Sequence, residues 1–437
     1  MNDDTWPAVP GEPFLDDPLV GRFRQDGPHA PRSGGILDSR AVRRWFRILR
    51  WGVPRNLYTY QQAWECRDGA RVEHRGRSLL MLSSYDYLGL QGDPRIEEAA
   101  IAATRACGTG TGGVRLLTGT TDLHVRLEHR LARLKGTEGA MTFGSGYAAN
   151  TGAITALFDS RDAVVADSLA HRSLIDGCRA AGVELRTFAH NDVEDLRRVL
   201  AELPAARRVL IAVDGVYSMD GDLCPLPDIV AVKREHGALL LVDEAHAIGT
   251  VGERGRGLHE HFGLDPDEVD LWTGSLSKAI PANGGYVAAS RDTIIYLQHG
   301  AAPYMFSAAV SPGASAAAET ALEIMEREPE RAARARRAGE SLRSGLGELG
   351  FDTGVSSTPL VPVILGPDAV AYRWARALWD EGFFASAVVY PAVARSASRL
   401  RLCGTAAYSD ADLKATIEVF ARLRERVGAV RMTSAAG

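Results

Sequence analysis

The chain has 437 residues and a formal net charge of −5, with 46% hydrophobic and 24% charged residues. This balance gives no reason to expect a nucleic-acid partner or a general affinity for membranes. No apolar run approaches the roughly 20 residues that span a bilayer, and the acidic, proline-containing start is unlike a secretory signal. The five cysteines are scattered without a CxxC pair, so we expect a cytoplasmic protein with no disulfide or zinc framework and no metal.

The first 94 residues are predicted to form an N-terminal extension and arm. Residues 1–40 are rich in Pro, Gly and Asp and lack periodicity, which predicts a mostly unstructured segment. Residues 41–51 predict a short amphipathic helix with Val42, Trp45, Phe46 and Leu49 on one side. Its four arginines, which occupy the rest of the helix surface, are Arg43, Arg44, Arg47 and Arg50.

Short apolar runs alternate with helical patterns over residues 95–312, which predicts a large domain with a mostly parallel sheet between helices. The predicted strands are 163–167, 208–215, 238–244, 271–275 and 285–290, and the helices between and before them include 146–157, 192–202 and 226–236. Residues 313–430 are predicted to form a smaller α+β domain, and the last residues are expected to be frayed. Its predicted elements are a long helix at 313–350, strands at 360–365, 384–390 and 399–403, and a helix at 410–427.

Only four lysines occur among the 50 basic residues, and this limits where covalent amine chemistry can take place. Arginine cannot replace lysine as an amine nucleophile, because its guanidinium stays protonated. Lys135, Lys233 and Lys414 lie among charged or helix-end residues, whereas Lys278 follows a predicted strand. By elimination, Lys278 is the candidate amine.

Asp243 ends another predicted strand, and ligands of open parallel sheets bind at the carboxyl ends of the strands. An amine and a carboxylate in one cleft are typical of a pyridoxal phosphate site. Lys278 would form the Schiff base, and Asp243 would keep the pyridinium nitrogen protonated. Two alternatives are a carboxylate that only caps the next helix and a lysine that is only solvated. A nucleotide hydrolase is excluded, because its DEAH-like segment would need a Gly-Lys phosphate loop and the chain has no Gly-Lys dipeptide.

Eight segments in order, at natural spacings, resemble the α-oxoamine synthase family of fold-type I pyridoxal phosphate enzymes, over roughly residues 83–425. They are SSYDYLGL (83–90), GTGTGGVRLLTGTTDLHVRLE (108–128), FGSGYAAN (143–150), HRSLIDG (171–177), GVYSMDGD (215–222), DEAHAIGTVGERGRG (243–257), SLSKAIPANGGY (275–286) and SRLRL (398–402). The resemblance implies an α/β large domain that binds the cofactor, a smaller C-terminal domain and a homodimer.

The resemblance also implies roles for single residues. His171 would stack on the cofactor ring, His246 and Ser218 would bond or tune its phenolic oxygen, and Arg401 would bind the amino-acid carboxylate. The implied phosphate contacts are Gly146 and Tyr147 at a helix N-terminus, Ser275, and Ser307 of the partner subunit. Without the resemblance, His171 could be a helix cap and Arg401 a surface arginine.

Three departures from the family pattern bear on which substrates are used. Asp86 stands where the family usually has Asn, Tyr408 stands where it usually has His, and the segment after Lys278 lacks the common glycine-rich form. An ionised Asp86 can only accept hydrogen bonds and would repel a substrate carboxylate nearby. We expect it to alter amino-acid recognition, most readily by pairing with an arginine.

The resemblance implies decarboxylative condensation of an amino acid with an acyl thioester, carried by coenzyme A or by an acyl carrier protein. The alternatives are a non-decarboxylating acyltransferase, an aminotransferase on the same fold, or an inactive subunit of a heterodimeric synthase. For the helix at 41–51 we favour packing of the apolar side within the enzyme's own dimer. An acidic carrier protein or an anionic membrane surface remains the other interpretation.

Overall fold

A seven-stranded sheet, mostly parallel, forms the centre of the large domain in the computed structural model, which describes residues 35–204 and 207–427. Only β10 runs antiparallel to its neighbours, β4 and β9. The strands are, in sheet order, β4 (Gly139–Phe143), β10 (Pro281–Ala289), β9 (Leu271–Ser277), β8 (Leu239–Asp243), β7 (Val209–Asp214), β5 (Ala163–Asp167) and β6 (Glu184–Phe188). The parallel α/β sheet expected from the sequence is confirmed, whereas β4 and β6 were not predicted.

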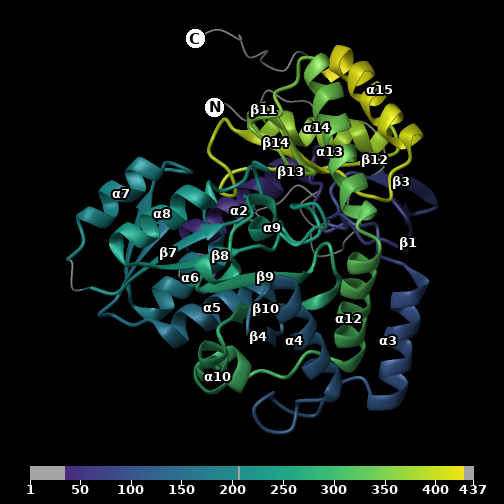
Figure 1. Cartoon of the computed structure of the whole chain (residues 1–437). Coiled ribbons are helices and arrows are strands. Elements are labelled where there is room, and N and C mark those ends of the chain that lie inside the picture. The colour runs from purple at the N-terminus through teal and green to yellow at the C-terminus, as the bar shows by residue number, and fades with distance from the viewer. Residues whose placement is uncertain (1–34, 205–206, 428–437) are drawn as a thin grey trace.

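Helices cover both faces of this sheet, and each face has its own hydrophobic core (Figure 1). Residues of α4, α7, α8 and α12 contribute to one core, and residues of α5, α6 and α10 contribute to the other. The helices of this domain are α3 (Pro94–Cys107), α4 (Asp122–Lys135), α5 (Gly146–Leu157), α6 (Arg172–Ala181), α7 (Val193–Ala201), α8 (Leu226–His236), α9 (Leu258–Phe262), η3 (Pro266–Glu268), α10 (Arg291–Gly300), α11 (Ala302–Met305) and α12 (Pro312–Arg327).

The C-terminal part packs three helices around a smaller sheet of order β11-β14-β13, which lies above the large domain in Figure 1. Its elements are α13 (Glu330–Glu348), β11 (Leu360–Gly366), α14 (Asp368–Asp380), β13 (Ser386–Val388), β14 (Ser398–Cys403) and α15 (Asp410–Val427). The predicted single helix over 313–350 is wrong, because the chain breaks between α12 and α13 at Glu328 and Pro329. The ring of Pro329 cannot continue a helix from the preceding turn.

The N-terminal segment packs on the C-terminal part of the chain. Strand β3 pairs in parallel with β12, so segments about 300 residues apart form one sheet of order β1-β2-β3-β12. Leu57, Leu80 and Leu82 belong to the same core as α14 and α15. The elements are α2 (Arg40–Gly52), β1 (Cys66–Asp68), β2 (Arg71–His74), β3 (Arg77–Met81) and β12 (Phe383–Phe384).

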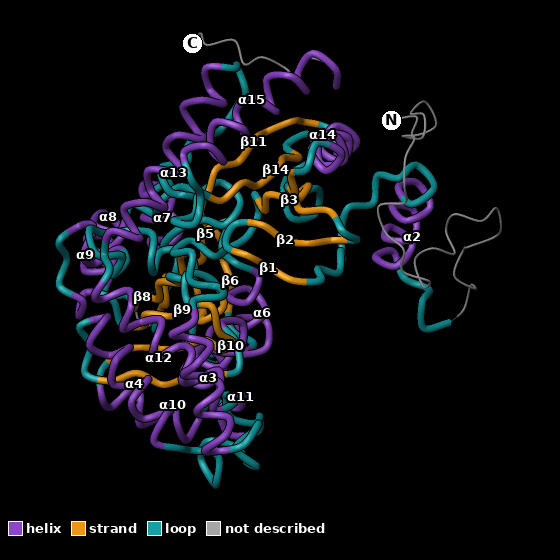
Figure 2. Tube along the Cα trace, turned by 90° about the vertical axis from the view of Figure 1, so that its right-hand side faces the viewer, coloured by secondary structure: helices purple, strands orange, loops and turns teal. Residues whose placement is uncertain are grey.

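Helix α2 confirms the predicted amphipathic helix and stands at the outer side of the molecule (Figure 2). Phe46, Leu49 and Tyr60 pack on Val53 and Tyr58 of the same chain. Trp45 keeps 41% of its surface exposed. The domain boundaries at 94, 312 and 430 stay predictions, and the predicted unstructured start (1–34) and frayed end (428–437) lie outside the described residues.

A buried ion pair connects the last residue of α4 with the end of β8. The Lys135 ammonium donates to Glu244 and, at 3.1 Å, to the carbonyl of Arg256, and it lies 4.1 Å from the ring centre of Trp272. Both charged side chains are fully buried. Burial lowers the pKa of Lys135 and raises the pKa of Glu244, so each charge depends on the other as its counterion.

We expect Lys135→Met to lower the free energy of unfolding by about 3–5 kcal/mol, because Glu244 would remain buried without a cation. Urea denaturation followed by circular dichroism measures this loss. The double variant Lys135→Met/Glu244→Gln removes both charges and should recover part of it. A loss below about 1 kcal/mol in the single variant would show that the pair does not stabilise the fold.

Candidate active site

The candidate catalytic side chains lie at the carboxyl ends of β7, β8 and β9, at one edge of the large sheet. Asp214 and Asp243 are directly paired residues of β7 and β8, so their side chains leave the sheet at the same level. Strand β9 ends at Ser277, and Lys278 follows it. The predicted meeting of Asp243 and Lys278 is therefore present, because both line one cavity of about 150 Å³.

An amide that the sequence did not single out holds Asp243. Asn150 of α5 donates to Asp243 Oδ2 at 2.6 Å and to Ser173 Oγ at 2.8 Å. The other carboxylate oxygen, Oδ1, accepts the backbone N–H of Ala245 at 2.9 Å. Asn150 is the last residue of the segment FGSGYAAN. The sequence does not reveal the partner of its side chain, because α5 meets Asp243 at the end of β8 only in the folded protein.

Asp214 is a second carboxyl in the cavity and was also missed. Its Oδ1 accepts the backbone N–H of His171 at 3.0 Å. Burial, reinforced by the negative charge of Asp243, raises the pKa of Asp214 well above its usual range. The two neighbouring carboxyls therefore differ in role, since Asp214 favours its protonated form.

Burial lowers the pKa of the Lys278 amine, although the charges of Asp243 and Asp214 oppose this shift. A lysine with a lowered pKa has a larger fraction of its amine in the neutral form near neutral pH. Neutral amine is the form that attacks carbonyl groups and accepts protons. The environment of Lys278 thus suits the covalent role predicted for it.

The two predicted histidines lie on the same cavity. His171 is the N-cap of α6, and its Nδ1 lies 2.7 Å from Ser173 Oγ. His246 Nδ1 lies 2.8 Å from the hydroxyl of Tyr87. Burial lowers the pKa of both rings, and the positive charge of Lys278 adds to this effect, so both favour the neutral form.

The N-terminus of α5 closes the cavity with groups suited to an anion. Gly146 and Tyr147 line it beside Ser275, whose hydroxyl lies 2.7 Å from that of Ser277. The backbone here leaves no room for a side chain, because a Cβ on Gly285 would lie 2.3 Å from the nitrogen of Gly146. Free N–H groups at a helix N-terminus and serine hydroxyls together favour a phosphate. The set of an amine, a carboxylate and an anion cradle fits pyridoxal phosphate.

A larger cavity of about 890 Å³ adjoins the first and shares Ser277 and Lys278 with it. The amine therefore lies where the two cavities meet. Asp86 lines the larger cavity and forms an ion pair with Arg67 at 3.1 Å. The expected pairing of Asp86 with an arginine is thus present, and the partner is one that the sequence did not single out.

Arg401 lies on β14, is 8% exposed, and is joined to both sides of the domain interface. Its Nη2 donates to the hydroxyl of Tyr85, and its Nη1 donates to the carbonyl of Ser218 at 3.2 Å. Its Nε is buried without a partner among the described residues. Tyr85 lines the larger cavity, so Arg401 reaches that space through Tyr85.

Three predicted residues line neither cavity, and Arg401, whose contacts are given above, is one of them. The side chain of Ser218 lines neither of them, although its carbonyl binds Arg401. Ser307 is exposed and also lines neither cavity in this chain, so its predicted contact from a partner subunit stays a prediction. Tyr408 donates to the carbonyl of Met81 at 2.8 Å, which makes it part of the packing between β3 and the C-terminal part.

Two absences hold for the part of the chain that the structure describes. No helix there is long and apolar enough to cross a membrane. No three acidic, histidine or cysteine side chains gather there as metal ligands would.

Comparison with known proteins identifies the family. The sequence model of class I and II aminotransferases matches residues 77–420. The chain is 45% identical to 8-amino-7-oxononanoate synthase of Symbiobacterium thermophilum, over 81% of this chain and 91% of that protein. It is 38% identical to serine palmitoyltransferase of Sphingobacterium spiritivorum, over 86% of this chain and 94% of that protein.

Solved structures agree with this assignment. Serine palmitoyltransferase from S. paucimobilis, solved with a pyridoxal phosphate adduct of myriocin, superposes with a TM-score of 0.82 at 32% identity. The match covers 84% of this chain and 93% of that one. An 8-amino-7-oxononanoate synthase from Francisella tularensis, at 23% identity and a TM-score of 0.69, shares the fold. The chain therefore belongs to the class I and II aminotransferase family and, within it, to the α-oxoamine synthases that its sequence motifs resemble.

Proposed function

We propose that the protein is a pyridoxal phosphate-dependent acyltransferase that condenses an amino acid with an acyl thioester and releases the carboxyl group as CO2. The observation that carries this proposal is the position of Lys278, which borders both the smaller cavity, together with Asp243, and the larger adjoining cavity. The relatives named above are synthases and acyltransferases, and this supports the same reaction class here. We expect the enzyme to act in the cytoplasm as a homodimer.

The residues of the smaller cavity have distinct tasks in this reaction. When bound, the cofactor would supply a ring able to accept the electrons left by loss of the α proton of the amino acid. Asp243, held by Asn150, would bind the ring nitrogen and favour a proton on it, and this would make the ring a better electron acceptor. Lys278 removes the α proton and later returns one, because its lowered pKa makes the neutral amine available.

The remaining polar residues orient the reactants. Arg401 would bind the amino-acid carboxylate through its guanidinium, since its buried Nε has no partner among the described residues. His171 would lie on the cofactor ring, where its position is set by Asp214 and Ser173. His246 in its neutral form can form one hydrogen bond with Tyr87 and another with the cofactor's phenolic oxygen.

An aminotransferase on the same fold is the second candidate, because it would use the same lysine and aspartate. The fate of the substrate carboxyl group separates the two reactions. We expect an amino acid labelled in its carboxyl carbon to release labelled CO2 only when an acyl thioester is present. Label retained in an acylated product would show a non-decarboxylating acyltransferase, and a keto acid formed without thioester would show an aminotransferase.

We expect borohydride reduction of the purified yellow enzyme to attach the cofactor to the peptide that contains Lys278. Lys278→Ala should lose this adduct and lower kcat by at least 10³-fold, because proton transfer and attachment both need the amine. Peptide mass spectrometry locates the adduct, and Lys233→Ala is a matched control. An adduct on another lysine of the wild-type enzyme would contradict the assignment.

The acyl donor is carried by coenzyme A or by an acidic carrier protein, and helix α2 allows a test of the second. Arg44 lies 5.5 Å over the ring of Tyr390, whereas Arg47 and Arg50 are exposed. Because the apolar side of α2 packs on its own chain, we expect Arg47→Glu/Arg50→Glu to leave turnover with a coenzyme A thioester within about twofold. A loss confined to a carrier-bound donor would establish that α2 docks an acidic carrier protein, and stronger retention of the wild type on anionic vesicles would establish membrane contact.

A further inference from the structure

A third cavity, of about 470 Å³, shares no lining residue with the two cavities that border Lys278. It lies between the C-terminal part of the chain and α2, which stands at the outer side of the molecule (Figure 2). Its walls come from three segments that are distant in the sequence, namely 44–51 of α2, 367–372 at the start of α14 and 390–396 before β14. A cavity of this volume is large enough for a small organic molecule.

The lining of this third cavity carries an excess of positive charge. Arg44, Arg47 and Arg395 line it, and none of them forms an ion pair with another described residue. Its one carboxylate belongs to Asp368, which accepts a hydrogen bond from the hydroxyl of Ser398 at 2.5 Å. Three positive charges thus face one negative charge, and a cavity with such an imbalance attracts anions.

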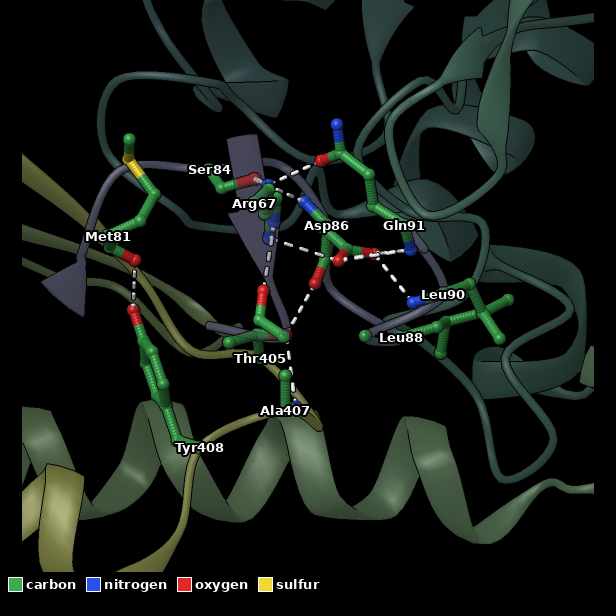
Figure 3. A network of polar contacts seen from close by, with 12 residues as sticks. Arg67, Met81, Ser84, Asp86, Leu88, Leu90, Gln91, Thr405, Ala407 and Tyr408 are labelled. Atoms are coloured by element: carbon green, nitrogen blue, oxygen red, sulfur yellow. Dashed lines mark hydrogen bonds and ion pairs between the residues drawn. The ribbon is translucent and has the colours of Figure 1, made fainter. Parts of the chain in front are cut away.

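Other arginines close by have a carboxylate partner. Arg67 of the larger cavity donates to Asp86 at 3.1 Å, within the network of polar contacts that Figure 3 shows. Arg43, which precedes Arg44 on α2, pairs with Asp38. The positive charge of the third cavity is therefore a local feature, because its arginines lack the compensation that their neighbours have.

Two of the guanidiniums lie over the same aromatic ring. Arg395 lies 4.2 Å and Arg44 lies 5.5 Å from the ring centre of Tyr390. Each contact is within the range of a cation–π interaction, but the two like charges near one ring also repel each other. The Nε of Arg44 is buried and has no hydrogen-bond partner among the described residues. An anion bound beside these guanidiniums would relieve the repulsion and accept a hydrogen bond from Arg44.

The remaining lining of the third cavity is mainly aromatic and apolar. The rings of Trp51 and Tyr372 lie with their centroids 5.9 Å apart, and Ile48 lines the cavity with them. Ile48 and Trp51 share one face of α2 with the two arginines of that helix, because all four recur at spacings of three or four residues. A flat ring is favoured beside these side chains, since stacking adds to the burial of apolar surface.

We propose that the third cavity binds a small molecule that carries a phosphate and a flat ring, such as a nucleotide, at a site separate from those of the two substrates. A phosphate monoester has about two negative charges at neutral pH, and this matches the excess positive charge of the lining. Guanidinium groups bind phosphate oxygens through paired hydrogen bonds. None of the residues assigned to the cofactor or the substrates lines this cavity, so the site does not depend on which reaction the enzyme catalyses.

Isothermal titration calorimetry with adenosine 5′-monophosphate as the probe tests this site. The enzyme is loaded with pyridoxal phosphate and freed of excess cofactor, so that the phosphate cradle of the smaller cavity is occupied. We expect saturable binding, with an affinity at least about tenfold above those for adenosine and for inorganic phosphate, because both parts of the probe contribute. In Arg44→Gln/Arg395→Gln the affinity should fall at least about tenfold, because two guanidiniums are lost.

Two further variants make the result specific. Arg50→Gln removes an exposed arginine of the same helix that does not line the cavity, and its affinity for the probe should stay within about twofold of the wild type. Trp51→Leu should weaken binding of the probe but leave the affinity for inorganic phosphate within about twofold, because only the ring loses its contact.

The proposal is overturned if the wild type shows no saturable binding of the probe, or if the double variant binds it as tightly as the wild type does. Inhibition by the probe that is competitive with the acyl thioester of coenzyme A also overturns it, because the probe would then occupy the place of a substrate. If the double variant has a lowered melting temperature, Arg395→Gln alone gives the same comparison, since Arg395 is exposed.

Discussion

The parallel register of β7, β8 and β9 is the constraint on which the rest of this structure depends. It places Asp214 and Asp243 side by side at one sheet edge, and Lys278 follows the next strand. Burial and the charge of Asp243 together raise the pKa of Asp214 well above its usual range. The same two acids moderate the effect of burial on Lys278. The pairing of the strands therefore places the two acids that influence the pKa of the Lys278 amine.

Buried ion pairs lie beside the candidate active site of this protein. Lys135 and Glu244 form a fully buried pair directly behind Asp243, and this pair holds the end of β8 in place. Arg67 and Asp86 form a second pair in the wall of the larger cavity. In both pairs a charge without its partner would carry the full desolvation cost. The first pair connects α4 with the end of β8, whereas the second lines the larger cavity.

The N-terminal segment has a structural role beyond that of an extension. Its strand β3 pairs with β12, and its leucines complete the core of the C-terminal part. The larger cavity lies between this combined unit and the large sheet. The tie between Arg401 and Ser218 also crosses this interface. The shape of the larger cavity therefore depends on how the two parts of the chain are joined.

The sequence by itself determined the reaction class and most local structure of this protein. Apolar strands that end in acids, one lysine at a strand end and eight ordered motifs were sufficient to predict the parallel sheet, α5, α8 and α15, and the meeting of Asp243 with Lys278. These features are local, because period, capping and strand ends are written in neighbouring residues. The tertiary structure decided the partners: Asn150 on Asp243, Glu244 on Lys135 and Arg67 on Asp86. Burial turned Lys135, one of several helix-end lysines in the sequence, into a structural cation. These charges are paired through contacts between segments that are distant in the sequence, and no local sequence pattern records such contacts.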